Sequence, residues 1–356
     1  MIVGSCGFGG TGSSAIKDLL KEFDNVQVLD RAESMFAFQV DGLQDLEHHV
    51  MKQYVRETSG EVAIKRFRDA SQYANVPFVK KVYLNPKKYK EDTEKFLKSI
   101  TQTTYRGLQN YDYQNTNWIK SFTILAFKKF VIKYYEKYTH NIYKWWPMRD
   151  ISVSIKPDNF YQSAREYMHN IIENGGGDFS KIIVLDQPFE GNNPSQSFPF
   201  FEDPYAIVID RDPRDLYMIS SYQWCAEPFL PRRDVEAFCV YYKKQRENID
   251  YKQDNERVLR LRLEEMIFDY DEMIKKVYDF LGFNPAKHIN KQKYFKPNVS
   301  IRGTQLYKKI PGHDSEIKYI EEHLKEYLFD FDSYEMSKQN TELTKNFNWQ
   351  SEDDKQ

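Results

Sequence analysis

The chain has 356 residues, which is enough for one large α/β domain with insertions or for two domains. Hydrophobic residues make up 40% of it and charged residues 29%, a balance typical of globular proteins. The formal net charge of −2 excludes a global attraction to nucleic acid or to an anionic membrane, so any basic site has to be local.

Cysteine content and hydropathy narrow the class of protein further. The three cysteines, Cys6, Cys225 and Cys239, lack the spacing of a metal site, and an odd number suits reduced thiols. No stretch approaches the ~20 apolar residues of a membrane helix. A strand that begins at Met1 leaves no room for a signal peptide. We therefore expect a cytoplasmic protein without a transmembrane segment or a metal site.

The first motif is a glycine-rich loop between an apolar strand at residues 1–3 and a helix predicted over 14–23. Residues 7–14 read Gly-Phe-Gly-Gly-Thr-Gly-Ser-Ser. The backbone N–H groups of such a loop, together with the helix N-terminus, bind a phosphate. The glycine spacing fits the Walker A pattern, but Ser13 stands in the place of its lysine. The loop therefore predicts a phosphorylated ligand other than the usual ATP or GTP.

The following elements alternate between helical and strand patterns. Apolar residues recur at intervals of three and four in four segments: 43–55, 91–106, 122–139 and 158–174. Short apolar runs, typical of buried parallel strands, predict four further strands: 26–30, 181–186, 206–210 and 258–263. The later helices are predicted at 214–223, 234–248, 270–281 and 315–327, with a polar loop at 283–311.

Strands at both ends of the chain with helices between them predict an α/β fold. We expect a P-loop-type three-layer sandwich with a central, mostly parallel sheet and a helical insertion. Residues 1–336 would form a single domain, and 337–356 a disordered polar tail. The insertion, at about 85–175, would lie over the carboxyl ends of the strands, where ligands bind in open sheets. It is therefore the expected lid over the acceptor.

The second motif, Asp-Arg-Asp-Pro-Arg-Asp at residues 210–215, follows the strand predicted just before it. Arg211 and Arg214 emerge where this strand gives way to a helix, with Ser220 further along that helix. Guanidinium groups bind phosphate bidentately, and hydroxyl groups add donors. A self-neutralising helix start explains Pro213 and the aspartates. It does not explain two arginines at the end of a core strand, so we expect a ligand there.

Together with three later segments, these motifs resemble the PAPS-dependent sulfotransferases, where PAPS is 3′-phosphoadenosine 5′-phosphosulfate. The later segments are the strand end at 262–267, the helix end at 279–283, and a loop with glycine and lysines at 302–309. All five stand in the family's order over residues 1 to about 330, with 85–175 outside the match. The chain looks most like the bacterial members that act on carbohydrates.

The resemblance implies roles for particular residues. Arg211 would bind the 3′-phosphate of PAPS, with Ser220 in place of a family serine that falls on Ile219 here. Arg302 and Gly303 belong to the late loop that would close over the nucleotide. The first loop would bind the 5′-phosphosulfate through six residues: Gly9, Gly10, Thr11, Gly12, Ser13 and Ser14. No metal is implied, because a sulfuryl donor carries less charge on the transferred group than a γ-phosphate.

The chain departs from the family at Gly10, where many members have a lysine or arginine that stabilises the leaving phosphate. Loss of this charge hurts a reaction whose leaving group becomes more negative. Either another cation takes its place or the activity is lost. The candidates are Arg31, just after the second strand, and Lys65 or Arg66 in the following segment.

A hydroxyl acceptor also needs a general base. Glu33 is the first candidate, because it follows the strand at 26–30, which we expect next to the first strand. Asp41 and Asp186 are reserves.

The sequence thus predicts a sulfotransferase that moves a sulfuryl group from PAPS to a hydroxyl, on a carbohydrate acceptor. Its partners would be the nucleotide donor and this acceptor, with no nucleic acid. Two alternatives stay open. One is a P-loop kinase, in which the strand at 206–210 ends in a metal-binding Asp. The other is a nucleotide-binding module without catalysis, which Gly10 suggests.

Overall fold

A computed structural model describes residues 1–30, 33–55, 58–72, 85–109, 111–112, 116–134, 148–223, 230–247 and 256–334. The chain divides into two compact units. The sheet unit comprises Met1–Phe38 and Gly175–Gln356, and the helical unit comprises Gln39–Asn174. The insertion predicted at about 85–175 lies almost wholly in the helical unit, and the tail predicted at 337–356 lies outside the described residues.

The sheet unit is built on five parallel strands in the order β2-β5-β1-β6-β7. Their bounds are β1 Ile2–Gly7, β2 Val26–Leu29, β5 Ile182–Asp186, β6 Pro204–Asp210 and β7 Val258–Arg262. All five agree with predicted strands, which confirms an α/β fold around a central parallel sheet.

The prediction that β2 lies next to β1 in the sheet is wrong, because β5 lies between them. The physical reason is burial. Ile183, Val184 and Leu185 of β5 are at most 2% exposed, so this strand needs a neighbour on each side. Every residue of β2 is only partly buried, which suits the edge of the sheet.

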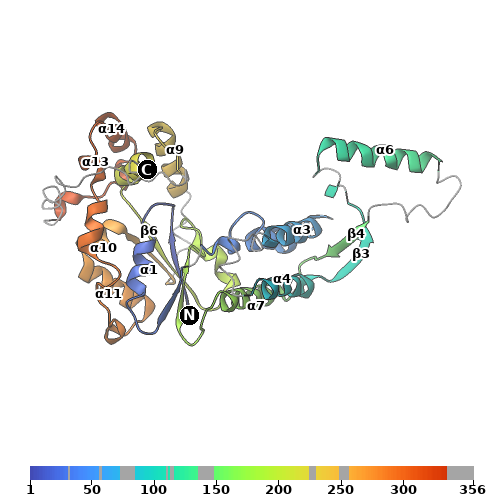
Figure 1. Cartoon of the computed structure of the whole chain (residues 1–356), viewed down its shortest axis with the longest axis horizontal. Coiled ribbons are helices and arrows are strands. Elements are labelled where there is room, and N and C mark those ends of the chain that lie inside the picture. Colours follow the sequence, from blue (N-terminus) through green and yellow to red (C-terminus); the bar gives the residue numbers. More distant parts are fainter. Residues whose placement is uncertain are drawn as a thin grey trace, which may run out of the picture. The chain divides into compact units, whose positions relative to one another are not determined.

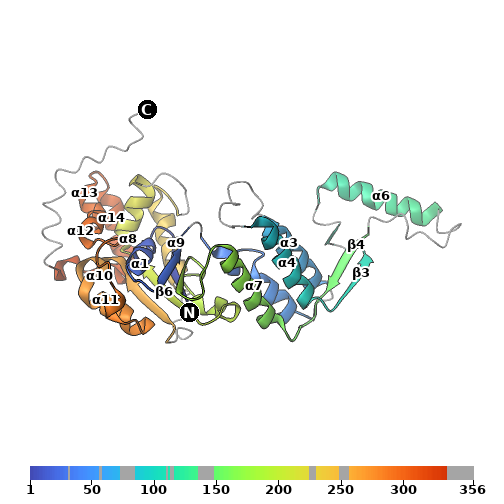
Figure 2. The same cartoon turned by 60° about the horizontal axis from the view of Figure 1, so that its bottom comes forward.

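One face of the sheet is covered by three helices: α1 Ser14–Leu20, α10 Leu263–Phe268 and α11 Tyr270–Leu281. Figures 1 and 2 show these helices on the same side of the sheet. Ile16, Ile274 and Val277 pack there against Val3 and Val184 of the strands. The predicted end of α11 is confirmed, since Gly282 follows it with φ 63°.

The opposite face is covered by the segment after β5, which contains a short 3₁₀ helix, Pro194–Phe200. Phe189 and Phe200 are fully buried. A Cβ at Gly4 of β1 would lie 2.5 Å from Phe189 Cδ2, so glycine lets this aromatic ring approach the strand.

A second core lies among α8 Pro213–Met218, α9 Val235–Glu247 and α14 Asp314–His323. Tyr217, Phe238 and Ile320 are fully buried in it. The predicted loop at 283–311 contains two short helices, α12 Pro297–Ser300 and α13 Leu306–Lys309.

The helical unit contains α2 Leu43–Glu47, α3 Ser59–Ser71, α4 Pro86–Ile100, β3 Thr103–Gly107, α6 Trp118–Tyr134, β4 Arg149–Val153 and α7 Phe160–Asn174. Phe96 of α4 stacks on Tyr167 of α7, with ring centroids 4.9 Å apart. The helix predicted to reach residue 106 ends at Ile100, because the β-forming residues that follow pair antiparallel with β4.

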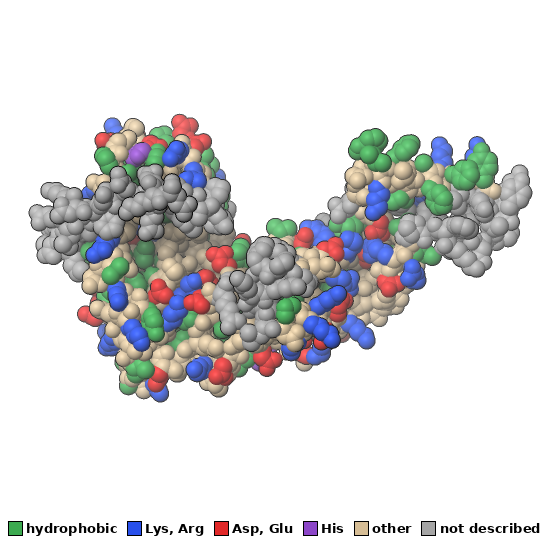
Figure 3. All heavy atoms as spheres, in the orientation of Figure 1, with side chains coloured by type: hydrophobic (Ala, Val, Ile, Leu, Met, Phe, Trp, Pro, Cys, Tyr) green, Lys and Arg blue, Asp and Glu red, His purple; other side chains and the backbone are tan. Residues whose placement is uncertain are grey.

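Large apolar side chains gather over α6 (Figure 3). Trp118 and Phe122 are 77% and 66% exposed. Among the described residues, no helix is long and apolar enough to cross a membrane.

Candidate functional site

The glycine-rich loop connects the end of β1 to the start of α1, as predicted. Gly9, Gly10 and Gly12 have φ values of 77°, 70° and 93°, which residues other than glycine rarely adopt. Thr11 is buried, and its Oγ1 accepts a hydrogen bond from the N–H of Phe8 at 3.1 Å, which closes the turn. The backbone N–H groups of the three glycines and Thr11 make no hydrogen bond to the described protein. They are therefore available to an anion.

Gln187 fixes this loop from the neighbouring strand. Its Oε1 accepts the N–H of Gly7 at 3.0 Å, and its Nε2 donates to Ser13 Oγ at 3.4 Å. Ser5 Oγ also donates to the carbonyl of Ser13, at 2.7 Å. Side-chain hydrogen bonds from Ser5 of β1 and from Gln187, just after β5, thus hold the loop in place.

An ion pair joins Lys17 of α1 to Asp186 at the end of β5. The two side chains are 13% and 14% exposed. Asp186 lies beside Ser5 in the sheet register, two residues before β1 ends. The pair therefore lies at the carboxyl edge of the sheet, on the side of the loop.

The loop and the ion pair line a cavity of about 760 Å³, all of it within the sheet unit. Its polar lining includes three carboxylates, Glu33, Asp186 and Glu190. Its cationic lining is Lys17 and Arg211, among the described residues. The remaining lining residues are Gly7, Phe8, Gly9, Gly10, Gly12, Ser13, Ser14, Met35, Phe38, Gln187, Phe189, Gly191, Asn192, Ile219, Tyr241 and Gln245. Six loop residues are expected to bind the donor, and five of them line this cavity. The sixth, Thr11, is buried and supports the turn.

Glu190 is the more buried of two glutamates in this cavity, since Glu33 is exposed. Burial raises the pKa of the Glu190 carboxyl. Arg260 positions the segment after it by donating to the carbonyls of Gly191 and Asn192 at 2.6 and 3.0 Å.

The three sequence candidates for a replacement cation have different outcomes. Arg31 lies outside the described residues. Lys65 and Arg66 belong to α3 of the helical unit, where Lys65 donates to Asp69 at 2.8 Å and Arg66 pairs with Asp41. Asp41 in this pair is one of the two reserve candidates for the general base.

Arg211 follows β6 and is 5% exposed. Its backbone N–H donates to Asp210 at 2.7 Å, and its Nη2 donates to the carbonyl of Gly303. Its Nε is buried and has no hydrogen-bond partner among the described residues. Because this guanidinium also lines the cavity, it is suited to bind an anion there.

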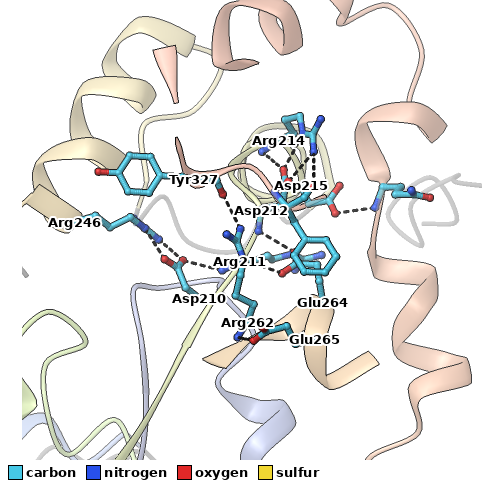
Figure 4. Close-up of polar contacts among 12 residues, drawn as sticks. Asp210, Arg211, Asp212, Arg214, Asp215, Arg246, Arg262, Glu264, Glu265 and Tyr327 are labelled. Atoms are coloured by element: carbon cyan, nitrogen blue, oxygen red, sulfur yellow. Dashed lines mark hydrogen bonds and ion pairs between the residues drawn. The ribbon is translucent and has the colours of Figure 1, made fainter. Parts of the chain in front are cut away.

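The residues around Arg211 form a fixed frame (Figure 4). Both carboxylate oxygens of Asp210 accept from Arg246, at 2.8 and 2.5 Å. Asp212 caps α8 through the N–H of Arg214 at 2.9 Å and also pairs with that guanidinium. Arg214 therefore has the helix-start role, whereas Arg211 faces the cavity.

Two buried carboxylates complete the frame. Asp215 accepts the N–H groups of Gln305 and Leu306 at 2.7 and 2.6 Å, and burial raises its pKa to about 6. Glu264 Oε1 accepts the N–H of Asp212 at 2.8 Å, and burial raises its pKa to about 7. Asp215 thus fastens the late loop to the start of α8.

The remaining nucleotide-site predictions fall on this late loop and on the helix after Arg211. Gly303 contacts Arg211 through its carbonyl, and Arg302 is exposed. Ser220 Oγ donates to the carbonyl of Tyr217 at 3.1 Å, while Ile219 lines the cavity.

Sequence reasoning missed Lys17, Gln187 and Glu190. Only Lys17 had a signal in the motif itself, since it follows Ser13 by four residues, or about one helical turn.

No family model and no curated protein sequence matches this chain. Among solved structures it is similar to the sulfotransferase domain from the curacin biosynthetic pathway, at 13% identity and TM-score 0.37, covering 91% of this chain and 97% of that one. It is also similar to the sulfotransferase domain of the Synechococcus PCC 7002 olefin synthase, at 11% identity and TM-score 0.37, covering 92% of this chain and 94% of that one. A third similar structure is sulfotransferase STF9 from Mycobacterium avium, at 11% identity and TM-score 0.34, covering 94% of this chain and 76% of that one. Because all three TM-scores are below 0.5, this similarity by itself assigns no activity to the chain.

Proposed function

We propose that this protein is a sulfotransferase that moves a sulfuryl group from PAPS to a hydroxyl group of a carbohydrate in the cytoplasm. The observation that carries the proposal is one cavity whose lining has two separate features suited to bind an anion. The glycine loop at residues 9–14 offers backbone donors, and Arg211 offers a buried guanidinium. PAPS has two phosphate groups at opposite ends of its ribose, and it needs two such features.

In this proposal the loop binds the 5′-phosphosulfate and Arg211 binds the 3′-phosphate. Arg302 and Gly303 close over the nucleotide. Ser220 is a lesser contact of the 3′-phosphate, because its hydroxyl hydrogen is already donated to Tyr217.

The reaction breaks the bond between sulfur and the bridging oxygen of PAPS, whose electron pair stays on the leaving phosphate. The acceptor oxygen forms the new bond to sulfur and loses its proton to a carboxylate. We propose Glu33 as this base, since it lines the cavity and is exposed. Glu190, which lines the same cavity and has a raised pKa, is the second candidate.

The kinase alternative meets an obstacle at Asp210, the residue that would hold the metal. Both of its oxygens accept hydrogen bonds from Arg246, and this guanidinium would compete with a magnesium ion for the carboxylate. This contact favours a donor that does not depend on a metal.

The proposal is tested by incubating the full chain with PAPS and a panel of glycans and measuring release of adenosine 3′,5′-bisphosphate. We expect release that depends on one of the glycans. Binding of the bisphosphate without turnover would instead support a nucleotide-binding module. Binding of ATP with magnesium, and none of the bisphosphate, would support the kinase.

A further inference from the structure

The cavity lining includes a cationic side chain, Lys17, although the loop motif itself has none. We infer that Lys17 stabilises the leaving phosphate, in place of the cation missing at Gly10, and that Asp186 is the positioning residue that holds its ammonium group. This inference rests on the proposed function, because it names a residue for that same site.

The position of Lys17 on α1 supports this role. Ser13 occupies the place of the Walker lysine, and Lys17 follows it by four residues, so both lie on the same face of the helix. The separation along the axis is about 6 Å. Side chains of a helix lean toward its N-terminus and cover the preceding turn. The long side chain of Lys17 is therefore directed back toward the loop.

Burial and the cavity lining give the second support. Lys17 and Asp186 both line the cavity with the loop glycines, although each side chain is less than 15% exposed. The ion pair with Asp186 therefore holds the ammonium group beside the cavity. Arg211, the other cationic lining residue among those described, is held by Gly303 and is assigned to the 3′-phosphate.

The alternative role for this ion pair is to fasten α1 to the sheet. The same helix offers a comparison, because Lys21, at its C-cap, pairs with Asp30 just after β2 at 2.8 Å. Lys21 does not line the cavity. If ion pairs of α1 only fasten the helix, loss of either lysine should have similar effects. If Lys17 binds the donor, the two losses should differ.

In the reaction Lys17 keeps its proton and donates a hydrogen bond to the oxygen that leaves sulfur. The negative charge on this oxygen grows as the bond to sulfur breaks, so the contact is strongest in the transition state. Loss of one such preorganised donor costs about 100- to 1,000-fold in kcat. The ground state of the donor should be affected less.

The first measurement is binding, which needs no acceptor. Calorimetry compares adenosine 3′,5′-bisphosphate with adenosine 3′-monophosphate, which lacks the 5′-phosphate, for the full chain and its variants. We expect Lys17→Ala to weaken the bisphosphate about tenfold and to leave the monophosphate unchanged. Lys17→Arg, which keeps a cation, should recover most of the loss, and Lys21→Ala should bind both ligands like the unchanged chain. Equal effects of Lys17→Ala on both ligands, or no effect, would overturn the inference.

The second measurement is turnover of PAPS with the glycan that supports it. We expect kcat to fall about 100-fold in Lys17→Ala, with a smaller change in the KM for PAPS, and to stay within twofold in Lys21→Ala. Turnover of Lys17→Ala at the rate of Lys21→Ala would contradict the assigned role. Failure of the unchanged chain to turn over PAPS is a different result: it contradicts the proposed function, while the binding comparison still tests the contact of Lys17 with a 5′-phosphate.

Discussion

The phosphate loop and the Arg211 region line one cavity, but the first presents backbone groups and the second presents charged side chains. The loop offers backbone N–H groups on glycines with positive φ, and Lys17 is the single cationic side chain near it in the described cavity lining. Around Arg211, by contrast, side chains of both signs are paired, including Asp212 with Arg214 and Asp210 with Arg246.

In the proposed function, the two ends of the cavity would recognise an anion through different groups. Backbone groups bind a phosphate of either ligand class, so the loop alone does not distinguish a kinase from a sulfotransferase. Guanidinium groups bind phosphate in a defined bidentate geometry, and Arg211 lines the same cavity as the loop, so we expect it to select a ligand with a second phosphate. Specificity should therefore depend on the Arg211 end and the chemical step on the loop end.

The largest expected effect is at the loop end, where the base must act. We expect Glu33→Gln to lower kcat by about 100- to 10,000-fold, because the amide cannot accept the acceptor's proton. Glu190→Gln is the matched variant in the same cavity. A loss confined to Glu190→Gln would move the role to Glu190. Rates would then rise with pH through a pKa above the ordinary glutamate value, since burial raises it.

The second prediction concerns the frame of Arg211 and its cost in stability. The pKa of Glu264 is about 7 in the folded chain, against an ordinary value of 4.5. The folded state therefore keeps a proton that the unfolded state releases, and the stability contributed by Glu264 falls as the pH rises from about 4.5 to 7.

Replacing this carboxyl with a neutral amide removes the dependence. We expect Glu264→Gln to gain free energy of unfolding relative to the unchanged chain between pH 5 and pH 8, by up to about 3 kcal/mol. Denaturant unfolding at the two pH values measures it. An equal difference between the two chains at both values would show that Glu264 is ionised throughout.

A smaller effect is expected at Gly12, where φ is 93° and a Cβ would lie 2.8 Å from Leu263 Cδ2. Gly12→Ala should distort the loop at a cost of about 1–2 kcal/mol, and so weaken bisphosphate binding roughly tenfold. Gly282→Ala is the control, since φ is also positive there but no atom lies within 4 Å of the new Cβ. Calorimetry should show weaker binding only for Gly12→Ala. Equal losses would mean that global stability limits binding.

The smallest effect is expected for Ser220→Ala. The hydroxyl hydrogen of Ser220 is donated to Tyr217, so its removal should change bisphosphate affinity by less than about threefold. A larger loss by calorimetry would make Ser220 a main ligand of the 3′-phosphate.

Much of the sheet unit was predictable, because its signals are local. Apolar runs identified β5 and β6, and glycine spacing identified the loop. The order of the strands was not, since the insertion of β5 between β1 and β2 depends on burial across the whole sheet.

The same limit applies to the site. The place of Arg211 in the cavity lining was predictable from its position after a strand. That of Glu190 was not, because no motif relates it to the loop with which it shares the cavity. The pairing of Lys17 with Asp186 joins residues 169 positions apart, and only the sheet register brings them together.

The central claim is that Arg211 selects a ligand with a 3′-phosphate. Its most direct test is calorimetry of adenosine 3′,5′-bisphosphate and adenosine 5′-monophosphate with the unchanged chain and with Arg211→Ala. We predict that the unchanged chain binds the bisphosphate about 100-fold or more tightly than the monophosphate, as expected for a buried charge-assisted contact. Arg211→Ala should bind both ligands equally. If the variant keeps the preference for the bisphosphate, the 3′-phosphate is bound elsewhere and the assignment is contradicted.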